Sequence, residues 1–153
     1  MSHQTSHICI ISGELSGDIY AADLIDQIKK LKPNASFSGI SGPLAHRAGL
    51  YLWPNCRTKS IMGFIQVLIH YFHYKQLLKK IEYHLRKNRP QLLILIDYAG
   101  LNLKVAKIAS LLHIKVFYFI PPKVWAWGQH RLKKIQKFVD CVALLYPFEL
   151  DYF

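Results

Sequence analysis

Asp97 is the carboxylate of this 153-residue chain whose sequence context best suits acid–base chemistry. It directly follows the apolar run Leu92 to Ile96, which is typical of a buried strand. A carboxyl group at the mouth of such a strand loses hydration, so its pKa rises and it can take a proton from a hydroxyl group. The same position also suits a cap of the following helix, because Asp is a favoured capping residue. The sequence therefore leaves two roles open for Asp97, a general base and a structural cap.

A second polar cluster, Gly13-Glu14-Leu15-Ser16-Gly17-Asp18, follows the apolar run His7 to Ser12. Its two glycines permit a tight turn and close backbone approach, and Ser16 is expected to cap the next helix. The spacing matches neither glycine-rich phosphate-binding motif, and Glu14 and Asp18 would repel an anion. Two interpretations remain: Glu14 or Ser16 binds a polar substrate, or the segment is an ordinary turn from strand to helix.

Two large aromatic residues, Trp125 and Trp127, lie in a loop that begins with Pro121-Pro122 and ends at a basic helix. Their flat side chains suit stacking on a sugar or anchoring at a membrane surface, and they equally suit plugging the core. The preceding long helical stretch, Ile61 to Leu85, carries one apolar stripe that indicates packing on a sheet. Its further apolar residues, Ile69, Tyr71, Tyr74 and Tyr83, are what a helix in contact with lipid would need.

The formal net charge of +11 predicts attraction to an anionic partner, such as nucleic acid, an anionic membrane or a phosphorylated substrate. No nucleic-acid recognition motif accompanies the charge, so nucleic acid is not the expected partner. The histidines lack ligand spacing except for the pair His3 and His7, so no catalytic metal is expected. Cys9, Cys56 and Cys141 form no C-x-x-C pair and are interpreted as reduced core thiols of a cytoplasmic protein.

Alternating apolar and amphipathic segments predict the scaffold that holds these residues. Continuous apolar runs predict buried parallel strands, and the amphipathic stretches between them predict helices. The predicted strands are His7 to Ser12, Ser36 to Ile40, Gly49 to Trp53, Leu92 to Ile96, Ile114 to Ile120 and Cys141 to Leu145, and the predicted helices are Ser16 to Leu31, Met62 to Lys87, Leu101 to Leu112 and Gln129 to Phe138.

This alternation predicts an α/β fold with a doubly wound, mostly parallel, Rossmann-like sheet, forming one domain over residues 1–153. Ligands of such sheets bind beyond the carboxyl ends of the strands. Glu14, Asp97 and the tryptophan loop all follow predicted strands, so we expect them to meet at one edge. The N-terminal residues lack the pattern of a signal peptide, so none is expected, and the longest apolar run, Ile61 to Phe72, is too short to cross a bilayer.

Six short motifs follow one another along the whole chain, and in order and spacing they resemble the lipid-A-disaccharide synthase family. The motif V-W-A-W and the motif S-I-M-G-F make the resemblance specific. The six are Gly13-Glu14-Leu15-Ser16-Gly17-Asp18, Gly39-Ile40-Ser41-Gly42-Pro43, Ser60-Ile61-Met62-Gly63-Phe64, Ile96-Asp97 with Asn102-Leu103, Val124-Trp125-Ala126-Trp127 before Arg131, and Pro147-Phe148-Glu149.

The resemblance implies the N-terminal half of an inverting GT-B glycosyltransferase of lipid A biosynthesis. Such an enzyme joins UDP-2,3-diacylglucosamine to 2,3-diacylglucosamine 1-phosphate (lipid X) and releases UDP, without a metal or other cofactor. Asp97 is implied to be the base for the 6-hydroxyl of the lipid X acceptor. The residues implied to bind substrate are Glu14, Ser16, Met62, Gly63, Phe64, Asn102, Trp125, Trp127, Gln129 and Arg131.

The sequence also departs from the family pattern. Gln66 stands where the family usually has an acidic residue, and Gly100 replaces the second Asp of a D-A-P-D-F-N loop. By the resemblance, the domain that binds the UDP-diacylglucosamine donor lies outside these 153 residues, so the isolated chain is expected to be inactive. The expected location is peripheral, on the cytoplasmic face of the bacterial inner membrane. The alternative is a non-catalytic remnant of the acceptor domain that binds lipid or membrane.

Overall fold

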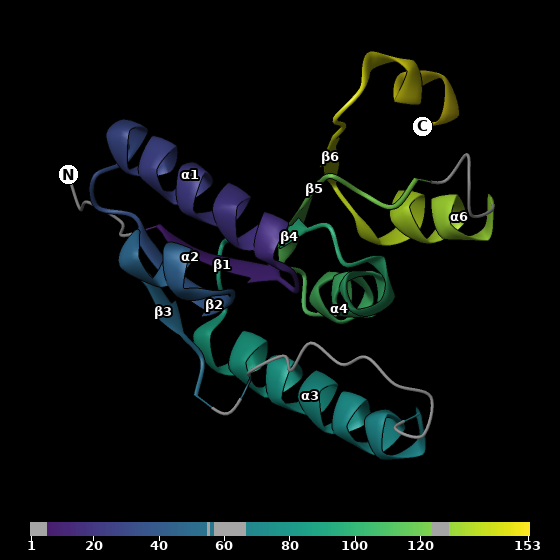
Figure 1. The fold of residues 1–153 in the computed structure, drawn as a ribbon, viewed down its shortest axis with the longest axis horizontal. Coiled ribbons are helices and arrows are strands. Elements are labelled where there is room, and N and C mark those ends of the chain that lie inside the picture. The colour runs from purple at the N-terminus through teal and green to yellow at the C-terminus, as the bar shows by residue number, and fades with distance from the viewer. Residues whose placement is uncertain (1–5, 55, 57–66, 124–128) are drawn as a thin grey trace.

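The computed structural model describes residues 6–54, 56, 67–123 and 129–153, and in these the predicted alternation of strands and helices is present (Figure 1). The strands are β1 (His7–Ser12), β2 (Ser36–Ile40), β3 (Leu50–Leu52), β4 (Leu92–Ile96), β5 (Lys115–Phe119) and β6 (Cys141–Ala143). The helices are α1 (Leu15–Leu31), α2 (Pro43–Arg47), α3 (Val67–Asn88), α4 (Ala99–Leu111) and α6 (Gln129–Phe138), with a final 3-10 helix η2 (Pro147–Tyr152).

The six strands form one sheet in the order β3-β2-β1-β4-β5-β6, and every pair of neighbours is parallel. The Rossmann-like α/β class predicted from the sequence is thus confirmed. The direction in which strands are added reverses between β1 and β4, because β2 lies on one side of β1 and β4 lies on the other. In sheets of this kind the crevice beyond that reversal is where ligands bind.

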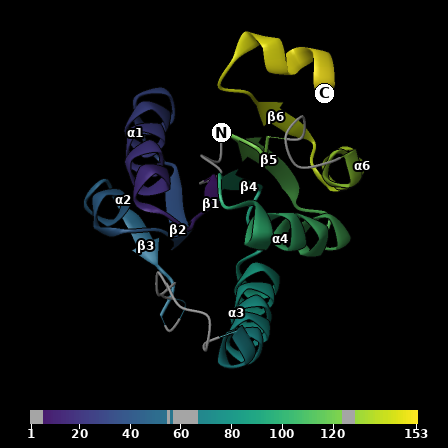
Figure 2. The same ribbon diagram turned by 45° about the vertical axis from the view of Figure 1, so that its right-hand side comes forward.

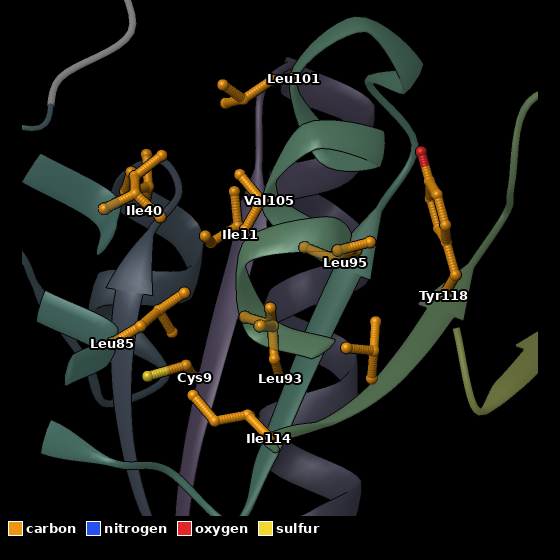
Figure 3. Packing of buried hydrophobic residues seen from close by; sticks show 14 of the residues in the cluster. Cys9, Ile11, Ile40, Leu85, Leu93, Leu95, Leu101, Val105, Ile114 and Tyr118 are labelled. Carbon is orange, nitrogen blue, oxygen red and sulfur yellow. The ribbon is translucent and has the colours of Figure 1, made fainter. Parts of the chain in front are cut away.

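Helices cover both faces of the sheet, as the two views in Figures 1 and 2 show. Side chains of α1 and α2, such as Ile25 and Ala45, pack against one face of the sheet together with Ile10 of β1. Helices α3, α4 and α6 pack against the opposite face, and Figure 3 shows part of that core. Ile81 and Leu85 of α3 are fully buried there, which confirms the predicted packing of the stripe for the described side chains of this helix.

Gly39 explains how closely β1 and β2 can approach. Its φ is 151°, and a β-carbon at this position would overlap the carbonyl oxygen of Ile10 on β1. A residue with a side chain would therefore push the two strands apart or change the backbone. The glycine keeps β2, and the loop that follows it, in register with β1.

The structure corrects three details of the sequence interpretation. Helix α1 begins at Leu15, with Glu14 in the N-cap position and no side-chain cap, so the expectation that Ser16 is the cap was wrong. The short helix α2 was not predicted, because its five residues carry no readable period. Strand β6 is shorter than expected and Cys141 is exposed on it, whereas Cys9 and Cys56 are buried thiols. Across the described residues, no helix is long and apolar enough to cross a membrane.

Candidate active site

The first loop and the Asp97 turn lie side by side because the strands before them are neighbours. Ser12 at the end of β1 is the register partner of Ile96 at the end of β4. The chain therefore leaves the two central strands at adjacent points of the carboxyl edge. Tyr98 joins the two segments, since its ring lies so close to Gly13 that a β-carbon on this glycine would overlap it.

The turn after β4 has an unusual backbone. Asp97 and Tyr98 have φ angles of 47° and 45°, so two successive residues that carry side chains adopt the left-handed conformation. Each such residue costs about 1–3 kcal/mol relative to ordinary backbone and persists only where surrounding contacts impose it. Strain of this kind is concentrated at functional sites in proteins. This strain, together with the place of the turn at the reversal point of the sheet, makes the turn a candidate site.

Hydrogen bonds hold the main chain of this turn on both sides. The Asp97 N–H donates to the carbonyl of Phe119 at 3.1 Å, and the Asp97 carbonyl accepts from the Asn102 amide at 2.7 Å and from the Tyr118 hydroxyl at 2.8 Å. Asn102 also donates from Nδ2 to the carbonyl of Ile96 at 3.1 Å. Both partners are buried and come from neighbouring elements, Asn102 from α4 and Tyr118 from β5.

The carboxylate of Asp97 differs from its backbone in its hydrogen bonding. Asp97 is half-buried, and none of the described residues forms a hydrogen bond or an ion pair with its side chain. It is also not the helix cap that the sequence allowed, because the N-cap of α4 is Tyr98 and no side chain caps that helix. The arrangement fixes the main chain of Asp97, and within the described part of the chain its carboxylate stays available.

Two charged residues, Asp97 and Arg131, act on the hydroxyl group of Tyr118. Burial raises the pKa of its hydroxyl and the negative charge of Asp97 raises it further, whereas the adjacent Asn102 side chain and the positive charge of Arg131 act in the opposite direction. The net effect is a pKa far above the ordinary value for tyrosine, so the hydroxyl stays protonated and can donate at any physiological pH. The charge of Arg131, in the first turn of α6, therefore acts at the same place as that of Asp97.

The next residues of the turn are fastened to α3. The Tyr74 hydroxyl donates to the carbonyl of Gly100 at 2.7 Å, and the ammonium group of Lys104 lies 4.6 Å from the centre of the Tyr74 ring. Burial raises the pKa of Tyr74, and the nearby Tyr98 raises it further. Helices α3 and α4 thus meet next to the turn that carries Asp97.

A second aspartate at this edge, Asp18 of α1, has the opposite environment. Only 2% of Asp18 is exposed, and its carboxylate accepts four hydrogen bonds of 2.9–3.0 Å, from the Ser41 hydroxyl and from three backbone N–H groups at the start of α2. Burial alone would raise the pKa of Asp18, but these hydrogen bonds outweigh it and hold the pKa below its usual range. Ser41 also bonds to Ser12 at 2.7 Å, so the network joins the ends of β1 and β2.

A hollow of about 640 Å³ lies beyond the ends of β2 and β3, on the same edge of the sheet. Its wall combines apolar side chains with polar groups, among them one hydroxyl group and one ammonium group. Those residues are Gly39, Ile40, Ser41, Leu52, Trp53, Pro54, Cys56 and Lys80. Trp53 is fixed there by a hydrogen bond from its indole N–H to Ser38 at 3.0 Å and by stacking on His84.

Comparison with protein families identifies the family of this chain. The family model described as lipid-A-disaccharide synthetase matches residues 8–153. The chain belongs to the lipid-A-disaccharide synthetase family. The resemblance inferred from six motifs is thus confirmed over nearly all of the sequence, and the match is to the N-terminal portion of this family.

Curated relatives agree with the family model. The chain is 39% identical over 153 residues to the lipid-A-disaccharide synthase of Nitrosococcus oceani, and 37% identical over 154 residues to that of Geobacter sulfurreducens. In both cases the match covers 100% of this chain and 40% of the relative. The chain therefore spans less than half the length of the lipid-A-disaccharide synthases that it matches.

Solved structures share the fold at low sequence identity. MurG of Acinetobacter baumannii superposes with a TM-score of 0.64 at 11% identity, covering 93% of this chain and 42% of MurG. A putative UDP-N-acetylglucosamine 2-epimerase of Listeria monocytogenes gives a TM-score of 0.66 at 7% identity, covering 92% of this chain and 38% of the epimerase. These two solved proteins therefore share the Rossmann-like fold of this member of the lipid-A-disaccharide synthetase family.

The candidate residues that the family resemblance implies differ in their surroundings in the structure. Glu14 and Ser16 are exposed at the start of α1, next to the Asp97 turn, and Arg131 is half-buried in the first turn of α6. Asn102 is fully buried, and both hydrogen bonds of its amide go to backbone carbonyls. Gln129 is the first residue of α6. The remaining candidates, Met62, Gly63, Phe64, Trp125 and Trp127, lie outside the described residues.

Sequence reasoning missed Tyr118 at this edge, and it placed Asp18 in the first loop without predicting the hydrogen bonds that its carboxylate accepts. Tyr118 has a readable signal: it is a tyrosine inside an apolar run that predicts a buried strand, and a buried tyrosine hydroxyl usually needs a hydrogen-bond partner. Asp18 has a weaker signal, because its partners begin 23 residues later in the sequence, at Ser41. Only the folded sheet brings that loop to the carboxylate.

Proposed function

We propose that this chain is the acceptor-binding part of a lipid-A-disaccharide synthase, with Asp97 as the general base. The observation that carries the proposal is the Asp97 turn, where a strained, hydrogen-bonded backbone leaves the carboxylate without a partner among the described residues. The turn lies at the reversal point of a parallel sheet, which is where ligands of such folds bind. Membership of the lipid-A-disaccharide synthetase family supports the substrate class that we propose, a phosphorylated and acylated glucosamine.

The proposed reaction is a single displacement with inversion. Asp97 takes the proton from the 6-hydroxyl of 2,3-diacylglucosamine 1-phosphate, and the resulting oxygen nucleophile forms a bond to the anomeric carbon of UDP-2,3-diacylglucosamine. The bond from that carbon to the UDP oxygen breaks, and UDP leaves with the electron pair. A base in hydrogen-bond reach of the hydroxyl contributes about 10²–10⁴ in rate.

The remaining candidates take their proposed roles from the same reaction. Arg131 is proposed to meet the acceptor phosphate, because a guanidinium group can bind phosphate through two hydrogen bonds and its charge already acts near Asp97. Glu14 and Ser16 are proposed to bind sugar hydroxyls from the neighbouring loop. Contact with sugar or acyl groups is proposed for Met62, Gly63, Phe64, Trp125, Trp127 and Gln129. Asn102 is buried and is proposed to contribute through the Asp97 turn.

The distribution of charge supports a phosphorylated lipid at a membrane as the substrate. Helices α3, α4 and α6 carry eleven lysines and arginines and one carboxylate, Glu82, so one layer of helices accounts for ten of the eleven net positive charges. Basic surfaces bind anionic membranes with about 1 kcal/mol for each Lys or Arg close to the lipid. We infer that this layer faces the cytoplasmic leaflet of the bacterial inner membrane and that the chain binds there peripherally.

Transfer is proposed to require the part of a lipid-A-disaccharide synthase that lies beyond the matched stretch, which would hold the UDP-sugar donor. Holding two reactants in the right geometry is worth about 7–11 kcal/mol in favourable cases. A chain that holds only the acceptor lacks that contribution, so the 153 residues on their own are expected to be inactive.

The test is a complementation assay. The purified chain is incubated with UDP-2,3-diacylglucosamine and radiolabelled lipid X, with and without the remaining stretch of the Nitrosococcus oceani enzyme joined to its C-terminus. Disaccharide formation only by the extended protein, abolished by Asp97→Ala, is the expected result. No product from an extended protein that folds and binds lipid X would overturn the catalytic proposal and favour the alternative, a non-catalytic module that binds lipid or membrane.

A further inference from the structure

The Asp97 turn depends on two side chains to which the sequence motifs give no catalytic part. Asn102 donates from one amide nitrogen to two successive carbonyls, those of Ile96 and Asp97, and its backbone N–H donates to the carbonyl of Tyr98. One residue thus contacts three consecutive peptide units of the turn. Tyr118 adds the second hydrogen bond to the Asp97 carbonyl.

The orientation of the Asn102 amide follows from its neighbours. Its Oδ1 atom is buried and has no hydrogen-bond partner among the described residues, while Nδ2 faces two carbonyl oxygens. Exchanging the two atoms would place an acceptor against two acceptors, which is unfavourable in a buried site. The side chain is therefore held with its donor toward the turn, although this leaves one acceptor unused.

Tyr118 is equally fixed. It has no exposed surface, and Figure 3 shows its hydroxyl at the end of the strand, directed toward the segment that joins β4 to α4. The register pairs Tyr118 with Leu95, so the side chain comes from the strand next to β4 and reaches the turn from the side. A hydroxyl held by a packed ring has a defined direction, and it supplies a donor that phenylalanine at this position would lack.

We propose that Asn102 and Tyr118 are positioning residues, which hold the left-handed backbone of Asp97 so that its carboxylate points toward the acceptor hydroxyl. Neither side chain needs to touch the substrate for this role. Without the two hydrogen bonds to its carbonyl, the peptide unit after Asp97 is free to rotate, and the carboxylate moves with it. The catalytic consequence rests on the proposed function, whereas the effect on the backbone does not.

The first test uses the 153-residue chain and needs no activity. Tyr118→Phe removes one oxygen atom, and Asn102→Asp replaces the donor by an acceptor of the same shape. We expect both variants to shift the backbone NMR resonances of Asp97 and Tyr98 and to speed exchange of the Asp97 amide hydrogen about tenfold, the equivalent of one lost hydrogen bond. The control is Val116→Ala, which opens a cavity in the same strand and face without touching the turn.

The results separate positioning from general stability. Val116→Ala is expected to lower the unfolding midpoint while leaving the Asp97 and Tyr98 resonances in place. Unchanged Asp97 and Tyr98 resonances in both Tyr118→Phe and Asn102→Asp would overturn the inference. So would equal changes in the Val116→Ala control, because the turn would then respond only to stability.

The second test uses the protein extended by the remaining stretch of the relative. There Tyr118→Phe is expected to lower kcat and alter the pH dependence of kcat, with KM for lipid X nearly unchanged, because the base is misplaced and the binding surface is kept. Equal kcat in Tyr118→Phe and the parent would overturn the catalytic part of the inference. If the resonances of the variants are perturbed but the extended protein forms no disaccharide, the proposed function is overturned. The backbone role of Asn102 and Tyr118 then still stands.

Discussion

The two faces of the sheet use their charged residues in different ways. On the side of α1 and α2 the helices carry three acids and three bases, and the buried acid, Asp18, has its carboxylate occupied by four hydrogen bonds. On the side of α3, α4 and α6 the helices carry eleven bases and one acid. The acid at the edge of that side is Asp97. Its backbone is fixed by hydrogen bonds, and its carboxylate has no hydrogen-bond partner among the described residues.

This difference distinguishes an acid that stabilises the fold, Asp18, from the proposed general base, Asp97. The carboxylate of Asp18 joins two loops because it accepts hydrogen bonds from backbone N–H groups at the start of α2. Its negative charge is therefore stabilised within the protein. The turn at Asp97 is instead strained and fastened by Asn102 and Tyr118, which bond to its carbonyl and leave the carboxylate alone. We expect substitutions at the first position to change stability and at the second to change activity.

The largest effect is expected for Asp97→Asn. In the extended protein this change should lower kcat for disaccharide formation about 10²–10⁴-fold, because an amide cannot take the proton of the acceptor hydroxyl. Its free energy of unfolding in urea should stay within about 0.5 kcal/mol of the parent, since the side chain has no hydrogen bond to lose among the described residues. A large loss of stability would show that Asp97 is a structural residue.

Asp18→Asn should show the reverse pattern. The amide keeps one acceptor oxygen where the carboxylate offers two, and it places a donor against backbone donors, so we expect a loss of about 2–4 kcal/mol in the free energy of unfolding. Urea denaturation measures this loss, and Asp23→Asn, at an exposed position of the same helix, is the matched control with an expected change below about 0.5 kcal/mol. Equal effects of the two changes would contradict the structural role of Asp18.

The contribution of Asp18 should also depend on pH in a defined direction. Because its pKa in the folded protein is lowered, the stabilisation is complete above the pKa of an unfolded Asp, about 3.9, and is lost as the pH falls through the lower folded value. The difference in unfolding free energy between the parent and Asp18→Asn should therefore be constant from about pH 7 to pH 5 and shrink below about pH 4. A difference that grows on acidification would contradict this assignment.

A smaller effect is expected when the basic face is altered. The double change Lys133→Gln with Lys134→Gln, at exposed positions of α6, should weaken binding to vesicles that contain anionic phospholipid by about 2 kcal/mol, roughly 30-fold. Lys30→Gln with Lys32→Gln, at exposed positions of α1 and its C-cap, is the matched control and should change binding little. Vesicle sedimentation at low salt measures both, and equal losses would show that the faces are not distinguished by membrane binding.

The scaffold was largely predictable because its strands are continuous apolar runs. The predicted segments His7 to Ser12, Ser36 to Ile40 and Leu92 to Ile96 match β1, β2 and β4 residue for residue. Helix α2 was not predictable in this way, since it is capped by Asp18, which lies 24 residues before Gly42. Local propensity contains no information about a partner so far away in the chain.

The site was predictable only in part, for a related reason. The position of Asp97 after a buried strand already indicated an acid at the carboxyl edge, and the motifs added its neighbours. What holds it could not be read from the sequence, because Tyr118 reaches the turn from another strand and Asn102 acts through backbone carbonyls. The strain at Asp97 and Tyr98 exists only in the folded chain.

The most direct test of the difference between the two faces is an NMR titration of the 153-residue chain with lipid X, presented in a neutral detergent. We predict that the resonances that shift first belong to the turn from Asp97 to Asn102 and to the start of α6, while those of Asp18 and of α2 stay in place. Shifts concentrated on α1 and α2, or no shifts at saturating lipid X, would contradict the assignment of the Asp97 side as the acceptor site.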